Sequence, residues 1–515
     1  MKSKALILLV TFQVNANNIA DYYNQILKTI SDVLNTVVES SRQLMYMGGS
    51  SLSDEFGKLV VRGDFNGDNY DDIAVRSVGF NDTGAILVVY GSLLGLVPSN
   101  YTEILPDSSI QKSDGFGFSL AAGDFDGDGK DDLAVGIPFY YYSGVTAAGI
   151  IAIYEGSSSG LQTTSSTTIA TGEGQSEKFG YSMVSGDYNG DGKDDLAVSS
   201  PYKAVNGVTS AGEVRVYNGT SLGLANTSLI IKQGANGVFG VPESGDLFGW
   251  SLASGDFNKD TSAAFFYDDL AIGVPFEDYH ATNDGIVQVL TGSEFGLVYS
   301  RLWSQDDSSD ETSEDDDMFG YTLATGNLNG IFPDDLADEL IIGVPYEDIG
   351  AVIDAGVVHA FYGSITGLVA TGNQVFSQET PGIYGSIEAG DQFGLSITTG
   401  NINPEGLFDI QDDLFIGVPL ENFAATDDGV VHIILGSQTG ADASNSILIA
   451  NDHPENFSKF GNSLATLSAS FYDGDQFSRS LIIGVPGYTL FDANSAGAIE
   501  EIKYINDNIF QDSFE

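Results

Sequence analysis

A Phe-Gly pair recurs seven times along this chain of 515 residues. The pairs are Phe56-Gly57, Phe116-Gly117, Phe179-Gly180, Phe248-Gly249, Phe319-Gly320, Phe393-Gly394 and Phe460-Gly461. Successive pairs are 60 to 74 residues apart, and most are followed by Gly-Asp or Gly-Asn and then by an apolar run that ends in Gly-Val-Pro or a related tripeptide. A repeat of this length predicts one supersecondary unit that buries its apolar face by stacking on copies of itself.

The second repeat shows the internal pattern of a unit. Its strand-like runs lie at residues 118–122, 133–138, 150–154 and 167–170, and Gly-rich turns separate them. Four short strands in one unit are typical of a propeller blade. We therefore predict an all-β fold, a seven-bladed β-propeller of four-stranded blades. The seventh repeat lacks its fourth strand, and the segment from Leu44 to Leu52 is a candidate to supply that strand and close the ring.

The repeats occupy nearly all of the chain after residue 50 and predict one large domain at 44–505. Residues 17–43 carry apolar side chains at helical spacing, so we expect a short N-terminal amphipathic helix that packs on the propeller or binds a partner. Residues 1–16 combine lysines, an apolar run and small residues, which is typical of a secretory signal peptide; a first core strand is the alternative. Residues 506–515 form an acidic tail.

The composition limits the partners of the chain. Its formal net charge is −53, which disfavours contact with nucleic acid phosphates and anionic lipids and favours divalent cations or high salt. There is no cysteine, so disulfides do not stabilise the fold. No segment reads as transmembrane, since the apolar run at the start is too short to cross a bilayer. We expect a secreted or cell-surface protein.

An acidic loop separates the first two strands in each of the first three repeats. Oxygen-bearing side chains occupy its positions 1, 3, 5 and 9, a Gly lies at or near position 6, and position 7 offers its backbone carbonyl. Calcium prefers six to eight oxygen ligands in flexible geometry, whereas softer metals prefer His or Cys. By loop, the candidate ligands are Asp64, Asn66, Asp68, Tyr70 and Asp72; Asp124, Asp126, Asp128, Lys130 and Asp132; and Asp187, Asn189, Asp191, Lys193 and Asp195.

Solvated Asp-Gly turns are the alternative, but the repetition of crowded carboxylates favours three calcium sites. The fourth repeat offers a candidate fourth site, whose ligands would be Asp256, Asn258, Asp260 and Asp269. The fifth and sixth repeats have Asn at positions 1 and 3, namely Asn327, Asn329, Asn401 and Asn403. We expect these two loops to be metal-free turns that Asn side chains hold in place.

Together, the Phe-Gly pair, the calcium loop and Gly-x-Pro resemble the FG-GAP repeat of integrin α-subunit propellers and of exported bacterial proteins. The resemblance covers about residues 44–505. It implies that the loops bind calcium on one face and that the propeller is a recognition platform in adhesion. Integrins typically carry these loops in their later blades, whereas the best loops here are in the first three. An integrin-like ligand face therefore does not follow.

We expect the protein to be a binding module for an extracellular protein or polysaccharide, and not an enzyme. A propeller-based lyase or hydrolase and a self-associating surface protein are the alternatives. His359 and His432 occupy equivalent repeat positions, which indicates a structural role, while His280 and His453 have no evident partner. Arg62-Gly63-Asp64 spells an adhesion tripeptide, but Asp64 is a predicted calcium ligand.

The segment from Asp306 to Asp317 is dense in Asp, Glu and Ser. It predicts a solvated loop insertion between repeats, with a loose additional cation site as the alternative.

Overall fold

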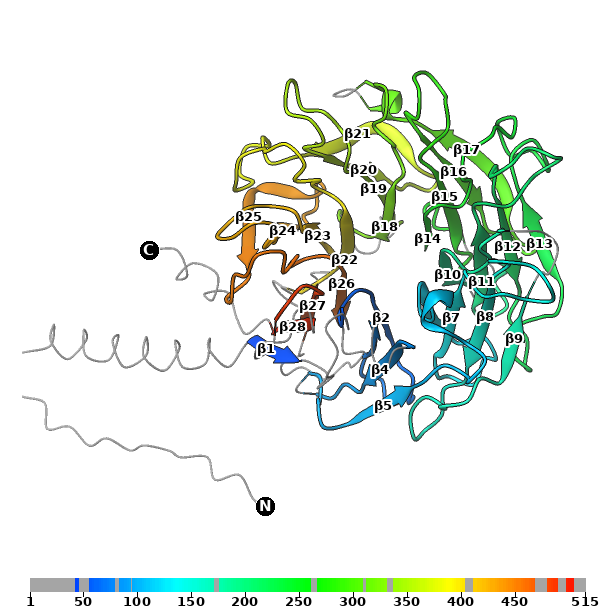
Figure 1. Ribbon diagram of the computed structural model, residues 1–515. Helices are drawn as coiled ribbons and strands as arrows, with labels where there is room; N and C mark the ends of the chain where they lie inside the picture. Colours follow the sequence, from blue (N-terminus) through cyan, green and yellow to red (C-terminus); the bar gives the residue numbers. More distant parts are fainter. Residues whose placement is uncertain are drawn as a thin grey trace, which may run out of the picture.

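A computed structural model describes residues 42–45, 55–78, 83–93, 95–170, 176–260, 266–308, 312–330, 337–402, 411–467, 479–489 and 497–503. The strands in these ranges form seven antiparallel sheets of four strands each, arranged in a ring around a central opening (Figure 1). The predicted seven-bladed propeller is therefore confirmed. The expected signal peptide, nearly all of the expected N-terminal helix and the acidic tail lie outside the described residues.

The blades follow one another along the chain. Blade 1 contains β2 (Val60–Gly63), β3 (Asp72–Ser77), β4 (Ala85–Val89) and β5 (Tyr101–Ile104). Blade 2 contains β6 (Leu120–Gly123), β7 (Asp132–Ile137), β8 (Ile150–Tyr154) and β9 (Thr167–Ile169). Blade 3 contains β10 (Met183–Gly186), β11 (Asp195–Ser200), β12 (Glu213–Tyr217) and β13 (Ser228–Ile231). Blade 4 contains β14 (Leu252–Gly255), β15 (Asp269–Val274), β16 (Ile286–Thr291) and β17 (Val298–Trp303).

The remaining blades repeat this order. Blade 5 contains β18 (Thr322–Gly326), β19 (Glu339–Val344), β20 (Val357–Tyr362) and β21 (Val369–Phe376). Blade 6 contains β22 (Ser396–Gly400), β23 (Asp413–Val418), β24 (Val430–Leu435) and β25 (Asp442–Ala450). Blade 7 contains β26 (Leu464–Leu467), β27 (Ser480–Val485), β28 (Ala498–Lys503) and β1 (Arg42–Met45). Among the described residues, the short 3₁₀ helices η2 (Lys112–Asp114) and η3 (Gln305–Asp307) lie between blades.

The two ends of the propeller meet in blade 7. Strand β1 pairs antiparallel with β28, so that Arg42 lies opposite Ile502 and Met45 lies opposite Ile499. The prediction that a segment before the first repeat closes the ring is thus confirmed. The strand begins two residues before the boundary expected at residue 44. The order β1-β28-β27-β26 gives blade 7 a full set of four strands drawn from both ends of the chain (Figure 1).

The core lies between neighbouring blades. The second strand of each blade is buried along its whole length, as in β7 and β15, because both of its faces pack against neighbours. The Phe of each Phe-Gly pair is also buried there, with Phe179 and Phe248 fully inaccessible. The Gly of the pair has a left-handed backbone; at Gly57 (φ +85) an added Cβ would lie 2.2 Å from the Ala498 carbonyl oxygen. The repeated pair therefore serves the packing of one blade on the next.

Within the described residues, no helix has the length and apolar character needed to cross a membrane.

Candidate functional site

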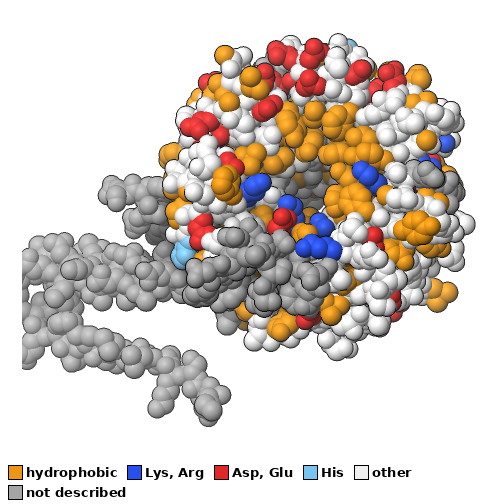
Figure 2. All heavy atoms as spheres, viewed as in Figure 1, with side chains coloured by type: hydrophobic (Ala, Val, Ile, Leu, Met, Phe, Trp, Pro, Cys, Tyr) orange, Lys and Arg blue, Asp and Glu red, His pale blue; other side chains and the backbone are white. Residues whose placement is uncertain are grey.

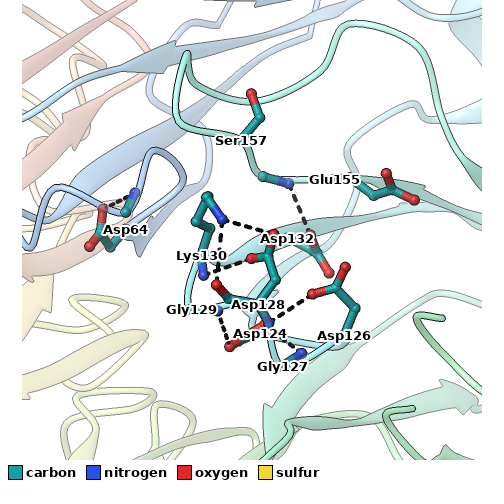
Figure 3. Close-up of polar contacts among 12 residues, drawn as sticks. Asp64, Asp124, Asp126, Gly127, Asp128, Gly129, Lys130, Asp132, Glu155 and Ser157 are labelled. Atoms are coloured by element: carbon teal, nitrogen blue, oxygen red, sulfur yellow. Dashed lines mark hydrogen bonds and ion pairs between the residues drawn. The ribbon is translucent and has the colours of Figure 1, made fainter. Parts of the chain in front are cut away.

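The acidic loop of blade 2 joins the inner strand β6 to β7 and folds around the carboxylate of Asp124 (Figure 3). The backbone N–H groups of Gly127 and Gly129 donate to the two oxygens of Asp124, each at 2.8 Å. The N–H of Asp128 donates to Asp124 and to Asp126, both at 3.0 Å. Gly127 (φ 75) and Gly129 (φ 84) adopt the left-handed conformation that this tight turn requires.

This turn brings three carboxylates together. One oxygen from each of Asp124, Asp126 and Asp128 lies within 4.8 Å of the others. Burial, followed by the negative charge of Asp128, raises the pKa of Asp126. The Nζ of Lys130 lies 2.8 Å from Asp128 Oδ2 and forms an ion pair with that carboxylate (Figure 3). A cluster that offers only oxygen atoms suits a hard divalent cation.

The Asp at loop position 9 is a predicted cation ligand and also accepts a backbone hydrogen bond. Asp132 is 3% exposed and accepts the N–H of Gly156 at 2.9 Å, which ties the loop to the turn before the fourth strand. The same bond recurs at Asp72, Asp195, Asp269 and Asp413. Sequence reasoning assigned Asp72, Asp132, Asp195 and Asp269 to calcium and Asp413 to a metal-free turn. The structure shows that all five hold the strand-connecting turn.

Burial is the main cause of the raised pKa values of the Asp residues at loop position 9. It raises the pKa of Asp72 and of Asp269 to about 8, and of Asp132 and of Asp195 to about 7. Nearby loop carboxylates raise the pKa values further. Such shifts indicate that these buried carboxylates have no compensating positive partner when they are ionised. A bound cation would provide that partner.

The loops of blades 1 and 3 repeat the geometry of blade 2. Asp64 accepts the N–H groups of Gly67, Asp68 and Asn69 at 2.8 to 3.1 Å. Asp187 accepts those of Asp191 and Gly192 at 3.1 and 2.8 Å. 

Blade 3 shows two further contacts within its loop. Asn189 donates its Nδ2 to both oxygens of Asp195, so its carboxamide would have to turn over to offer an oxygen ligand. Lys193 pairs with Asp191, as Lys130 does with Asp128. The Tyr70, Lys130 and Lys193 carbonyls remain predicted ligands.

The loop of blade 4 retains free ligand capacity. The Oδ1 atoms of Asp256 and Asp260 are buried and accept no hydrogen bond from the described residues. Asn258 lies between them in sequence and exchanges hydrogen bonds with Asp260. Burial raises the pKa of Asp256 to about 6. These groups fit a fourth cation site.

The loop of blade 5 is described in part, because residues 331–336 lie outside the described residues. The Oδ1 atoms of Asn327 and Asn329 are buried without a hydrogen-bond partner among the described residues. The backbone N–H of Leu328 donates to the Glu339 carboxylate. In blade 6, Asn403 lies outside the described residues.

Sequence reasoning missed a structural role of the Asp that precedes loop position 9. This Asp is the first member of an Asp-Asp pair or, at Asp338, of an Asp-Glu pair. Asp131 accepts the N–H of Asp64, which belongs to the preceding blade, at 2.8 Å, and its own N–H donates to the Asp64 carbonyl at 3.0 Å. Asp194, Asp268, Asp338 and Asp412 repeat this exchange with the blade before each of them. The pair therefore combines a bridge between blades with a predicted cation ligand. Its regular occurrence was the available sequence signal.

A row of aromatic side chains lies on the face opposite the loops. Phe118, Tyr181, Trp250 and Tyr321 each follow a Phe-Gly pair, at the end of the inner strand remote from the loop. Their ring centroids are 4.9, 5.2 and 5.4 Å apart from one blade to the next. All four are half-buried. Figure 2 shows apolar side chains around part of the rim of the central opening.

A second set of aromatic residues packs beside this row. It consists of Phe139, Tyr202, Phe276 and Tyr346, which follow the proline that ends the second strand and contact the row edge-on at 5.2 to 5.9 Å. We call the eight residues the aromatic row. Sequence reasoning missed it, although an aromatic residue at a fixed offset from Phe-Gly was visible in four repeats.

Other sequence features have ordinary roles in the structure. Arg62 lies 3.8 Å from Asp71, and the Asp64 carboxylate is occupied by loop N–H groups, so the tripeptide is part of the loop structure. His359 and His432 are fully buried, in agreement with a structural role. His280 has a partner that the sequence did not reveal, because its Nδ1 lies 2.6 Å from Asp306 Oδ2.

Comparisons with known proteins agree with the fold. A model of the FG-GAP repeat matches residues 116–154, 179–217 and 248–290. Human phosphatidylinositol-glycan-specific phospholipase D is 24% identical over 522 residues, which cover 90% of this chain and 58% of that protein. Integrin alpha-PS2 of Drosophila melanogaster is 33% identical over 44% of this chain and 16% of its own length. Mouse integrin alpha-8 is 31% identical over 47% of this chain and 20% of its own length.

The chain thus spans less than two thirds of the length of these relatives. The three matched repeats begin at the Phe-Gly pairs of blades 2, 3 and 4, which carry acidic loops. The chain therefore contains FG-GAP repeats and is similar to integrin α subunits over part of its length.

Proposed function

We propose that this propeller is a secreted, calcium-stabilised binding module for an extracellular protein or polysaccharide, and that it is not an enzyme. The aromatic row carries the proposal. Half-buried aromatic side chains from four consecutive blades form one continuous surface, with successive ring centroids 4.9 to 5.4 Å apart. Surfaces of this kind are characteristic of recognition sites, where aromatic residues contribute a large share of the binding energy.

Calcium would act on this surface indirectly. The predicted oxygen ligands at Asp124, Asp126 and Asp128 belong to the loop that follows β6, Asp132 begins β7, and the aromatic residue Phe118 lies two residues before β6. A cation would fix the loop end of the inner strand and remove the repulsion among its carboxylates. The strand would then present its aromatic residue from a more rigid position. No ligand contact with the ion is required.

The decisive test measures binding to immobilised extracellular matrix proteins and to a glycan array in millimolar calcium. We expect Trp250→Ala to weaken binding at least tenfold. Phe295→Ala is the matched control, because Phe295 is 89% exposed on an outer turn away from the row. Equal loss in both variants, or full binding by Trp250→Ala, would contradict a recognition role for the aromatic row.

The enzyme alternative rests on the human relative named as a phospholipase D, which aligns with 90% of this chain. Its test is the release of a glycosylphosphatidylinositol-anchored reporter, or of fragments from polysaccharides, by the purified chain. Release that scales with the amount of protein would favour an enzyme over a binding module. Self-association is tested separately by size-exclusion chromatography with and without calcium.

A further inference from the structure

Three junctions between blades share a buried Gln–Glu pair on the face opposite the acidic loops. Each Gln lies two residues after an outer strand, and each Glu lies two residues after the proline that ends the second strand of the next blade. The pairs are Gln233–Glu277, Gln305–Glu347 and Gln378–Glu421, and in each one Nε2 of Gln donates to Oε2 of Glu at 2.6 Å. All six side chains are at most 7% exposed.

The oxygen of each carboxamide lacks a hydrogen-bond partner among the residues that the structure describes. The Oε1 atoms of Gln233, Gln305 and Gln378 are buried and accept no hydrogen bond from any described residue. A buried acceptor that is left without a hydrogen-bond partner destabilises the folded chain. Because the same unsatisfied acceptor recurs at three equivalent places, a single common occupant is the economical explanation. A cation beside the Glu carboxylate would satisfy the amide oxygen as a ligand.

A second buried carboxylate lies two residues before the Phe-Gly pair of each junction, and at two junctions it interacts by charge with the paired Glu, Asp246 with Glu277 and Asp391 with Glu421. These second carboxylates belong to Asp246, Asp317 and Asp391, all at most 3% exposed. Burial, together with the nearby Glu243 and Asp278 carboxylates, raises the pKa of Asp246 to about 6. Burial and charges from the same cluster raise the pKa of Glu277 to about 7. The charge interactions that shift both groups come from carboxylates.

The same pattern holds at the other two junctions. The pKa of Asp317 is raised to about 7 by burial and by the Glu314 and Asp348 carboxylates. That of Asp391 is raised to about 7 by burial, with Glu421 and Glu388 as the neighbouring charges. Asp317 thus lies buried, whereas the sequence predicted a solvated loop from Asp306 to Asp317.

The junction between blades 2 and 3 shows what such a cluster requires. There Lys203 stands where the other junctions have Glu, two residues after the proline, and Glu177 stands where they have Asp. The Nζ of Lys203 lies 3.1 Å from Glu177 Oε1 and 3.8 Å from Glu213 Oε1, and all three residues are buried. At this junction the chain supplies its own cation. At the other three, the lysine is replaced by a further carboxylate.

We propose that each of these three junctions binds one calcium-type divalent cation. The ligands would be the Gln Oε1 and the carboxylates of Glu and Asp, that is Gln233, Glu277 and Asp246 at the first junction. All are oxygen donors, which is the set that a hard cation prefers. The sites are separate from the acidic loops, because they lie at the opposite ends of the inner and second strands.

The test counts bound calcium on the full chain by equilibrium dialysis and elemental analysis. We expect the combined variant Asp64→Asn, Asp124→Asn and Asp187→Asn, which impairs three loops, to retain at least three ions. Glu277→Lys, Glu347→Lys and Glu421→Lys should each bind one ion fewer than the unchanged protein. Each copies the arrangement of Lys203, so each should fold and should melt with a smaller response to EDTA.

Two further variants keep the test decisive. Glu294→Lys makes the same charge change on an exposed outer turn and should leave the ion count unchanged. Glu277→Gln removes the carboxylate without adding a charge and should also lose one ion. Unchanged counts in Glu277→Lys and Glu277→Gln would overturn the proposal, whatever the ligand-binding assays show. A count reduced equally by Glu294→Lys would overturn it as well.

Discussion

Substituting Asp132 by Asn should stabilise the calcium-free protein and weaken its response to calcium. Asp132 is buried and accepts the Gly156 N–H at 2.9 Å, and an Asn side chain can still accept this bond. Burial and the carboxylates of Asp126 and Asp124 raise the pKa of Asp132 to about 7. At pH 8 without calcium, the folded chain must therefore hold a buried charge that the amide would not carry.

The magnitude follows from the pKa. A rise from 3.8 to about 7 corresponds to up to about 4 kcal/mol of lost stability once the group is ionised. Because the loop can open to solvent, we expect Asp132→Asn to recover about 1–2 kcal/mol in EDTA. In millimolar calcium the same change removes a ligand. A site with a Kd near 10⁻⁴ M contributes about 1.4 kcal/mol, which the variant would lose.

The pH dependence has a defined sign. The pKa of Asp132 is higher in the folded chain than in the unfolded chain, so its destabilising effect is complete above about pH 7. The advantage of Asp132→Asn in EDTA should therefore be largest at pH 8 and decline as the pH falls toward 4. For the same reason, calcium should bind the unchanged loop less tightly as the pH falls below 7, because protons compete for the ligand.

The assay is thermal and urea unfolding at pH 8, in EDTA and in 1 mM calcium. Asp413→Asn is the matched control, since Asp413 accepts the N–H groups of Ile402 and Gly436 but belongs to a loop with Asn at position 1. We expect the control to show the same difference between calcium and EDTA as the unchanged protein. If Asp132→Asn lowers stability equally in both conditions, Asp132 is a turn residue and not a cation ligand.

Three further predictions concern the ring itself. Asp268→Ala removes the acceptor of the Asp187 N–H (2.9 Å) and should lower stability by about 1–3 kcal/mol with or without calcium, while Asp268→Asn should lose less; equal melting of all three proteins would refute the bridge. Deleting residues 42–45 removes β1 and should abolish cooperative unfolding, and a sharp melt like that of the full chain would contradict closure by this strand. Burial lowers the pKa of His359 to about 3, so the stability that its neutral ring contributes is present above about pH 6.5 and falls at lower pH. The melting temperature of His359→Leu should therefore drop less between pH 7 and pH 5, by an amount equivalent to about 2 kcal/mol, and an identical drop would refute this explanation.

The fold was predictable because its signals are local and repeated. The Phe-Gly pairs, the apolar second strands and the Gly-rich turns each indicate a piece of one blade, and the repeat indicates how the pieces stack. Closure by β1 followed from counting strands, since the seventh repeat had one too few. The exact strand, Arg42–Met45, did not follow, because four residues carry little periodicity.

The candidate site was only half predictable. The spacing of Asp124, Asp126 and Asp128 indicated an oxygen cluster, and the structure brings these carboxylates together. The spacing did not distinguish the roles of the two members of each acidic pair, because their hydrogen-bond partners lie far away in the sequence. Asp131 bonds to a residue 67 positions away, whereas Asp132 bonds to the next turn of its own blade. The Gln–Glu pairs depend on contacts 42 to 44 residues apart and were equally invisible.

The proposed cation sites lie on both faces of the closed ring and belong to different blades. The acidic loops belong to blades 1 to 4 on one face, while the Gln–Glu junctions join blades 3 to 6 on the other. The junction of blades 2 and 3 instead contains the internal ammonium of Lys203. In a closed ring, a blade cannot separate from one neighbour without strain on the next. Cations on different faces and blades would therefore stabilise one cooperative unit, which explains why a chain with a net charge of −53 need not place all its ion sites in one motif.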